Sequence, residues 1–199
     1  MNKKKWSALD LTMGGLFVAL MTVGANITSI APFMVVGGVP ITLQTFFAIL
    51  AGLVLGSRLG AFSMFVYMVL GLAGAPIFAQ FKGGASIALS PTFGFILSFI
   101  ILAYVIGKMV EVNRGLPMYI TASIIGLVIN YVVGTNWMYG AYIWWFGGAP
   151  EGFSYQLAWA WMMVPLPKDI ILAVLAGIFA HRMERTILSK SQFRMQKAA

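Results

Sequence analysis

Lys168 and Asp169 are adjacent charged residues that immediately precede the last long apolar run of the chain, residues 170–180. An ion pair beside a membrane-spanning segment costs free energy and is usually kept for a function. A lysine with a carboxylate suits a small ligand that carries an anionic tail and N–H donors. The alternative is a solvated helix start, in which Asp169 interacts favourably with the helix dipole. The two residues by themselves leave both interpretations open.

A glycine-rich gap between two earlier apolar runs supplies further candidates, namely Lys82, Gly83, Gly84, Ser86 and Thr92. Glycines permit unusual backbone angles, so this segment could close over a ligand as a lid, or it could be a plain turn. We expect this gap to lie on the same side of the membrane as the charged pair.

Polar residues within the apolar runs are few. Gln44 lies near the outer end of its run and could face a ligand. Thr42, Thr45 and Asn130 could hydrogen-bond across helices, which is the interpretation we favour for Asn130. His181 borders the basic tail and is expected to be solvated.

A dense group of aromatic residues surrounds the gap at residues 147–164. An aromatic belt at the membrane interface explains about half of them. The others suit the apolar wall of a ligand pocket, for which Tyr155 and Trp159 are our candidates. The group comprises Trp137, Tyr139, Tyr142, Trp144, Trp145, Phe146, Phe153, Tyr155, Trp159 and Trp161.

Several kinds of chemistry are excluded. The chain has no cysteine and one histidine, which excludes thiolate metal sites and leaves little room for a histidine cluster. There is no P-loop, because Leu102 stands where the first glycine before Gly107 and Lys108 would be. No nucleophile–base pair and no chain of buried carboxylates can be assembled within the apolar runs. We therefore expect no enzymatic activity, no metal and no cofactor, and any uphill transport must draw its energy from a partner.

The elements that must position these residues are membrane helices. The chain has 199 residues, 60% hydrophobic and 9% charged, whereas soluble domains are about 45–50% apolar and about 25% charged. Since a membrane helix needs about twenty apolar residues, we predict a single all-α domain, residues 1–199, embedded in the lipid bilayer. Its six spans are expected at about 8–31, 41–57, 59–79, 88–107, 116–146 and 165–181.

The net charge of +8 is distributed as in a membrane protein, not as in a nucleic-acid-binding protein. Eleven of the thirteen basic residues fall at the two ends or in alternate gaps, which places both termini in the cytoplasm by the positive-inside rule. The first apolar run is longer than the roughly 7–15 residues of a signal-peptide core, so we expect a retained first helix. The eleven are Lys3, Lys4, Lys5, Arg58, Lys108, Arg114, Arg182, Arg185, Lys190, Arg194 and Lys197.

Small residues four apart allow helix backbones to approach closely in a membrane. Gly15 and Ala19 in the first run form the one strip that we consider a docking surface for another membrane subunit. The remaining small residues are expected to pack inside the bundle: Gly52, Gly56, Gly60, Ala173 and Gly177.

The run Pro40-Ile41-Thr42-Leu43-Gln44-Thr45-Phe46-Phe47, followed by residues 51–52 and 56–61, strongly resembles the BioY family. These are the biotin-specific substrate-binding (S) components of energy-coupling factor (ECF) transporters. The likeness covers most of the chain in the same order. It continues at residues 71–72, 75–78, 83–84 and 91–95, and returns at residues 165–167 with Asp169.

The resemblance implies a six-helix bundle that binds biotin near the outer face, beneath the loops after helices 1 and 3. It implies a cell-membrane protein that works with a membrane scaffold subunit and two ATPase subunits. Gly15 and Ala19 match the small-residue strip by which the first helix of family members contacts that scaffold. Some family members have been proposed to work without this energising module.

The resemblance also implies roles for the candidate residues. Asp169 would accept from the ureido N–H groups of biotin, and either Lys168 or Lys82 would meet its carboxylate. The loop of Gly83 and Gly84, with Ser86 and Thr92, would close over the ligand, while Tyr155 and Trp159 would flank its rings.

One departure from the family pattern concerns the lysine. The family commonly has a lysine three residues after the aspartate, where this chain has Leu172, and here the lysine precedes the aspartate. Adjacent helical residues point about 100° apart, so we expect Lys168 to reach alongside Asp169 only if it lies in a loop.

Three alternatives stay open. The first is the same fold binding a different vitamin, and the second is a small membrane enzyme that acts on lipid or protein. The third is a purely structural subunit, which predicts no affinity for small molecules.

Overall fold

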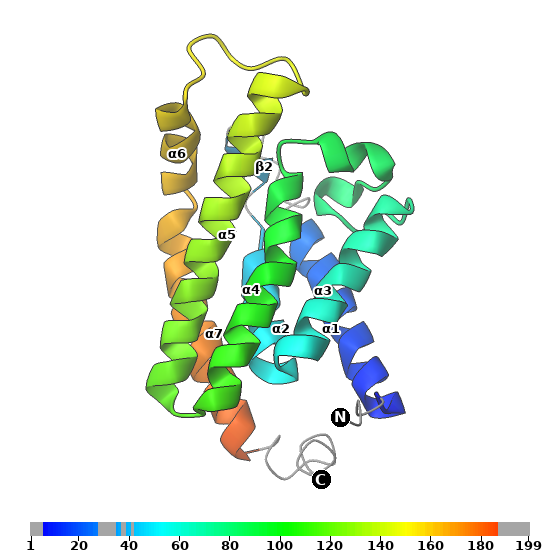
Figure 1. The fold of residues 1–199 in the computed structure, drawn as a ribbon, viewed down its shortest axis with the longest axis vertical. Helices are drawn as coiled ribbons and strands as arrows, with labels where there is room; N and C mark the ends of the chain where they lie inside the picture. The colour runs from blue at the N-terminus through cyan, green and yellow to red at the C-terminus, as the bar shows by residue number, and fades with distance from the viewer. Residues whose placement is uncertain (1–5, 28–34, 37–38, 41, 187–199) are drawn as a thin grey trace.

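The computed structural model describes residues 6–27, 35–36, 39–40 and 42–186, and over these ranges the chain is almost entirely helical (Figure 1). The helices are α1 (Ala8–Asn26), α2 (Gln44–Leu55), α3 (Ser57–Leu72), α4 (Phe93–Val112), α5 (Leu116–Trp144), α6 (Tyr155–Met163) and α7 (Leu166–Thr186). Two 3₁₀ segments, η2 (Ala79–Phe81) and η3 (Ala85–Leu89), join α3 to α4. Strands β1 (Val35–Val36) and β2 (Val39–Pro40) pair antiparallel, with Val35 opposite Pro40.

Some predicted features lie outside the described residues. They are the end of the first predicted span, most of the gap that follows it, and the basic residues Lys3, Lys4, Lys5, Lys190, Arg194 and Lys197.

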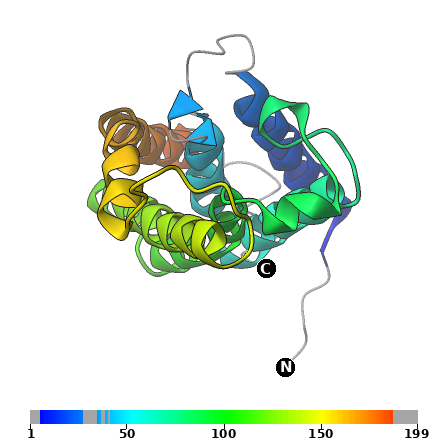
Figure 2. The same cartoon turned by 90° about the horizontal axis from the view of Figure 1, so that it is seen from above.

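The helices form one bundle, as expected of a membrane protein (Figures 1 and 2). α1, α4 and α5 are long and apolar enough to cross a bilayer, and α6 with α7 would form a fourth crossing, bent by 56°. α2 and α3 are shorter apolar helices of 12 and 16 residues. At about 1.5 Å per residue, α2 extends only about 18 Å, which is less than the roughly 30 Å hydrocarbon core. The N-terminus of α2 can therefore lie within the membrane.

Each of the six predicted spans overlaps a helix, but four boundaries and one gap differ clearly from the prediction. α3 ends at Leu72, not at 79, and α4 begins at Phe93, not at 88, because turns and the 3₁₀ segments η2 and η3 lie between them. α4 and α7 each continue five residues past the predicted ends at 107 and 181, because helical hydrogen bonding does not stop where the apolar run stops. The gap predicted at residues 147–164 contains α6, whose N-cap residue Ser154 accepts a hydrogen bond from the Leu157 amide.

Small residues pack inside the bundle as predicted. A Cβ atom on Gly52 would lie 2.8 Å from the Ala103 carbonyl oxygen of α4, and one on Gly177 would lie 3.1 Å from the Ile120 Cα atom of α5. These glycines therefore permit close helix contacts that a larger residue would prevent. Gly15 differs, because a Cβ atom there would meet nothing within 4 Å. Gly15 and Ala19 both lie on the exposed face of α1.

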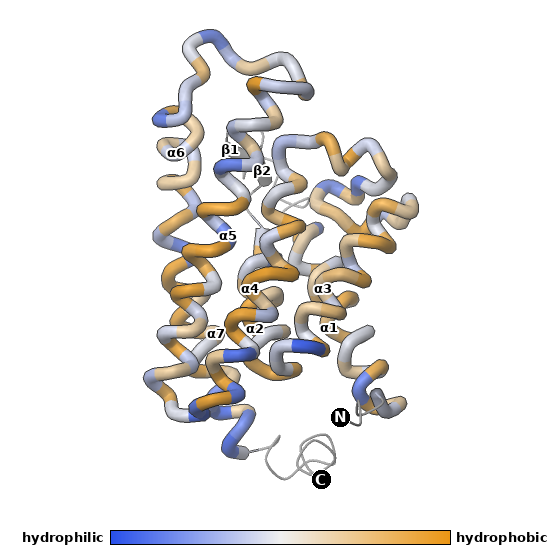
Figure 3. The backbone as a smooth tube through the Cα atoms, viewed as in Figure 1, coloured by the Kyte–Doolittle hydropathy of each residue, from blue (hydrophilic) through white to orange (hydrophobic). Residues whose placement is uncertain are grey.

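One end of the bundle, which we call the inner end, contains the start of α3, the end of α4 and the end of α7 (Figures 1 and 3). Glu111 accepts hydrogen bonds from the Ser57 amide and hydroxyl, each at 2.8 Å, and so caps the first turn of α3. Arg114 donates to Glu184 at 2.7 Å and connects the α4–α5 turn to α7. Polar contacts therefore hold the helices together at this end.

His181 also lies toward the inner end, but it is not the solvated residue that we predicted. Its ring is half-buried and packs edge-on against the ring of Tyr119, with 5.3 Å between the centroids. The reason is that this position of α7 faces α5.

Candidate functional site

A cavity of about 370 Å³ lies toward the opposite, outer end of the bundle. This volume falls within the roughly 300–1,000 Å³ that is usual for small-molecule sites. Most of the surface that lines it is apolar, although ten of its 22 lining residues are polar or charged. The apolar and aromatic residues are Phe78, Ala79, Ile87, Pro91, Phe95, Ile96, Phe99, Tyr131, Tyr142, Phe146, Met162 and Pro165. The polar and charged residues are Thr42, Gln44, Thr45, Gln80, Lys82, Ser90, Thr92, Asn130, Lys168 and Asp169.

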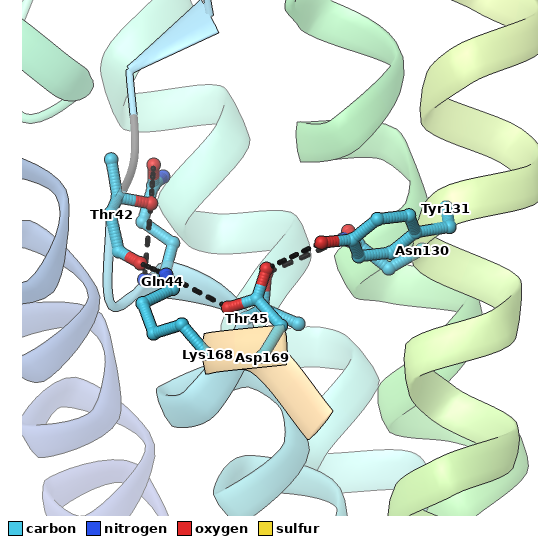
Figure 4. A network of polar contacts seen from close by, with 7 residues as sticks. All are labelled: Thr42, Gln44, Thr45, Asn130, Tyr131, Lys168 and Asp169. Carbon is cyan, nitrogen blue, oxygen red and sulfur yellow. Dashed lines mark hydrogen bonds and ion pairs between the residues drawn. The ribbon is translucent and has the colours of Figure 1, made fainter. Parts of the chain in front are cut away.

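The charged centre of this cavity is Asp169, in the first turn of α7 (Figure 4). Its Oδ1 atom lies 2.8 Å from Lys168 Nζ, and its Oδ2 atom accepts a 2.8 Å hydrogen bond from the Tyr131 hydroxyl. Asp169 is only 8% exposed, so it is not the solvated helix start considered above. A buried carboxylate needs such partners because desolvation disfavours its charge.

The structure corrects our expectation that Lys168 could reach Asp169 only from a loop. Both residues lie in α7, and their charged groups nevertheless form an ion pair. The long, flexible lysine stem overcomes the angle between neighbouring helical positions. Lys168 also donates a 2.7 Å hydrogen bond to the Thr42 carbonyl oxygen, so it links α7 to the segment that precedes α2.

Gln44 connects the cavity to α3. Its Oε1 atom accepts from the Thr42 hydroxyl at 3.2 Å, and its Nε2 atom donates to the Tyr67 hydroxyl at 3.0 Å. The Tyr67 hydroxyl in turn donates to the Ile77 carbonyl oxygen at 2.9 Å. Hydrogen bonds thus run from Lys168 through residues 42 and 44 to the segment after α3.

Asn130 forms the cross-helix hydrogen bonds that we predicted. Its Nδ2 atom donates to the Thr45 hydroxyl of α2 at 3.3 Å, and its Oδ1 atom accepts from the Ser98 hydroxyl of α4 at 2.8 Å. All three residues are buried. Because these side chains hydrogen-bond one another, Asn130 and Thr45 are held in fixed orientations where they line the cavity.

The glycine-rich segment is divided between the cavity and the end of α3. Lys82 and Thr92 line the cavity, whereas Gly83, Gly84 and Ser86 are not among its lining residues. A Cβ atom on Gly83 would lie only 2.3 Å from the Ala75 carbonyl oxygen. The Gly84 amide donates to the Gly71 carbonyl oxygen at 2.7 Å. These two glycines thus pack the segment against α3.

Tyr155 and Trp159 of α6, which we predicted to flank the ligand, are not among the lining residues of the cavity. Their ring centroids are 6.3 Å apart, and the Tyr155 hydroxyl donates a 3.3 Å hydrogen bond to Asn136 Oδ1. Tyr142 and Phe146, which belong to the same aromatic group, line the cavity instead. Both come from the outer end of α5 and the residues just after it.

Sequence reasoning missed three polar residues that line the cavity, Tyr131, Gln80 and Ser90. Tyr131 lies 38 positions from Asp169, with which it hydrogen-bonds, so no local pattern joins the two. Gln80 lies two positions after residues 75–78, which carry part of the family resemblance, and that proximity was the available signal.

The arrangement can bind a small ligand that combines a polar group, an apolar body and a negative charge. The buried Asp169 can accept from N–H donors, and the aromatic walls can pack against rings. Among residues 6–27 and 42–186, no three histidine, cysteine, aspartate or glutamate side chains gather where they could hold a metal ion.

Comparisons with known proteins agree with this picture. The model of the BioY family matches residues 1–189. BioYB of Bacillus subtilis (strain 168) is 42% identical over 195 residues, which cover 97% of this chain and 96% of that protein. The biotin transporter BioY of Thermotoga maritima is 40% identical over 125 residues, or 63% of this chain and 71% of that protein.

A solved structure shares the fold. It is the S-component for biotin from an ECF-type ABC transporter, with a TM-score of 0.75 and 19% sequence identity. The match covers 96% of this chain and 99% of the solved one.

Proposed function

Because the chain belongs to the BioY family, we propose that it is a membrane-embedded biotin-binding subunit of a vitamin uptake transporter. The observation that supports this most strongly is the buried Asp169 carboxylate in a largely apolar cavity of ligand size. Its role is binding and delivery, not catalysis. The ligand is biotin itself, taken up from outside the cell.

Asp169 accepts hydrogen bonds from the ureido N–H groups of biotin. Carboxylate oxygens accept more than one hydrogen bond each, so the bonds from Lys168 and Tyr131 leave capacity for a ligand. The fused rings of biotin are mostly apolar and pack against Tyr142, Phe146 and their neighbours in the cavity wall.

Lys82 meets the carboxylate of biotin. The ureido ring and the carboxylate lie at opposite ends of biotin, joined by a flexible chain, whereas Lys168 Nζ is 2.8 Å from Asp169. Because these two side chains are so close together, one biotin molecule cannot easily place its carboxylate against Lys168 and its ureido ring against Asp169. Lys82 ends η2, and the η2–η3 segment lies across the outer end of the bundle from α6 (Figures 1 and 2).

Energy for uptake comes from a membrane scaffold subunit with two ATPase subunits, since the chain has no P-loop. The exposed strip of Gly15 and Ala19 on α1 is the surface that docks on the scaffold, because small residues permit close helix approach. Both termini face the cytoplasm, which places the basic inner end on that side.

The direct test is a calorimetric titration of the purified protein with biotin in detergent, without partner subunits. The expected result is saturable binding of one biotin per chain, which an excess of thiamine or riboflavin does not reduce. Preferential binding of another vitamin would assign a different ligand to the cavity. The absence of binding for the whole panel would overturn the proposed function.

A further inference from the structure

The segment Ile77–Lys82, between α3 and η3, has a backbone conformation that it cannot easily hold by itself. It forms a tight turn in which the Phe78 amide donates to the Lys82 carbonyl oxygen at 3.0 Å. Gln80 and Phe81, consecutive non-glycine residues, have φ angles of +62° and +54°. Such left-handed conformations cost free energy and persist only where surrounding contacts hold them.

The base of this turn is anchored by Phe78. Its side chain is 2% exposed, and its ring packs edge-on against Tyr67, with 5.4 Å between the centroids. Gly71 leaves the space for it, since a Cβ atom there would lie 2.1 Å from Phe78 Cζ. The tip has no such anchor, because the Phe81 side chain is 62% exposed.

Asn26, at the C-terminal end of α1, holds the tip. Its Oδ1 atom accepts a 2.7 Å hydrogen bond from the Phe81 amide. Its Nδ2 atom donates to the Thr22 carbonyl oxygen at 3.0 Å and lies 3.5 Å from the Ile77 carbonyl oxygen. The bond within α1 fixes the orientation of the amide group, so that Oδ1 faces the turn. Asn26 is 7% exposed, so its bond to Phe81 is shielded from competing water.

We propose that Asn26 is a positioning residue for the cavity, because its amide holds the turn that brings Gln80 and Lys82 to the cavity wall. This inference rests on the proposed function insofar as it concerns biotin affinity. Asn26 is absent from the cavity lining, whereas Gln80 and Lys82 both belong to it. The turn is also linked to Gln44, a cavity-lining residue of α2. The Ile77 carbonyl oxygen accepts from the Tyr67 hydroxyl, which in turn accepts from Gln44 Nε2.

The test compares Asn26→Ala and Asn26→Asp with Thr22→Ala as the matched control. The control residue lies one turn earlier on α1, and its hydroxyl donates to the local Val18 carbonyl oxygen at 3.0 Å. Hydrogen–deuterium exchange of the peptide that contains Phe81 is measured in the biotin-free proteins. Asn26→Ala should raise that exchange about tenfold. Asn26→Asp should restore only part of the protection, because it keeps an acceptor oxygen but loses the Nδ2 donor to the Thr22 carbonyl oxygen. Thr22→Ala should leave exchange unchanged.

Biotin affinity provides a readout that a purely structural role would not reproduce. Asn26→Ala should weaken biotin binding about five- to tenfold, and the loss should fall below about twofold when Gln80→Ala and Lys82→Met are already present. Unchanged exchange at Phe81, or an undiminished affinity loss in that background, would overturn the inference. If the wild-type protein binds no biotin, the proposed function fails, and exchange at Phe81 alone decides whether Asn26 holds the turn.

Discussion

The two ends of the bundle use their carboxylates differently. At the inner end, Glu111 of α4 accepts from both the amide and the hydroxyl of Ser57 at the start of α3. At the outer end, Asp169 forms its ion pair with its own sequence neighbour, Lys168. Glu111 thus caps the start of a neighbouring helix, whereas Asp169 and its partners face a cavity.

This difference indicates why a carboxylate is retained at each place. Glu111 satisfies donors that would otherwise lack partners at a helix N-terminus. Asp169 instead borders a cavity, where it pairs with Lys168 and accepts a hydrogen bond from Tyr131 of α5. The inner carboxylate therefore acts in stability, and the outer one is available to a ligand.

The largest predicted effect on stability concerns the inner end. Glu111→Ala leaves the buried Ser57 amide without its acceptor and should lower the free energy of unfolding by about 2 kcal/mol. Unfolding in detergent measures this loss. Lys108→Ala is the matched control, because its exposed ion pair with Glu111, at 3.6 Å, should contribute less than about 0.5 kcal/mol. Reduced biotin affinity of the folded Glu111→Ala protein would contradict the division between the two ends.

The next effect distinguishes the two lysines at the outer end. Lys82→Met should weaken biotin binding about tenfold, or about 1.4 kcal/mol, because a charge-assisted contact with the biotin carboxylate is lost. Binding of biotin methyl ester, which lacks that charge, should be unaffected by the same substitution. The measurement is a pair of titrations for each protein. If only Lys168→Met shows this selective loss, the carboxylate lies next to Asp169 and our placement is wrong.

The smallest effect on binding is expected at α1, where adjacent glycines differ in their surroundings. Gly15→Leu should change biotin affinity by less than about twofold, since its position is open, but should abolish assembly with the scaffold subunit. Co-purification measures assembly, and Val128→Phe on the exposed face of α5 is the control. Normal assembly of Gly15→Leu would rule out this strip as the docking surface.

Gly14→Leu should instead destabilise the bundle, because a Cβ atom there would lie 3.0 Å from Ser63 Oγ.

The fold could be predicted because apolar runs alone identify membrane helices. α6 was missed because its nine residues are too short to appear as a span, although Ser154 was an available N-cap signal. The ends of α4 and α7 were predicted too early because hydropathy reports the membrane, whereas the helices continue beyond it as charged segments.

The site could be predicted only where its residues are unusual in themselves. Lys168 and Asp169 stood out as charges beside an apolar run, and their ion pair is present. Tyr131 and Asn26 resemble ordinary helix residues, and their roles come from partners 38 and 55 positions away along the chain. Contacts at such separations arise from packing, which a single sequence does not display.

The most direct measurement of the central claim is the biotin affinity of Asp169→Asn, compared with wild type and with Glu151→Gln. Glu151 is an exposed carboxylate at the outer end that does not line the cavity. Asp169→Asn should bind biotin at least about a hundredfold more weakly, because the ureido N–H groups lose a charged acceptor, while Glu151→Gln binds like wild type. Melting temperatures of all three proteins establish that each is folded. Undiminished biotin affinity in Asp169→Asn would contradict the account.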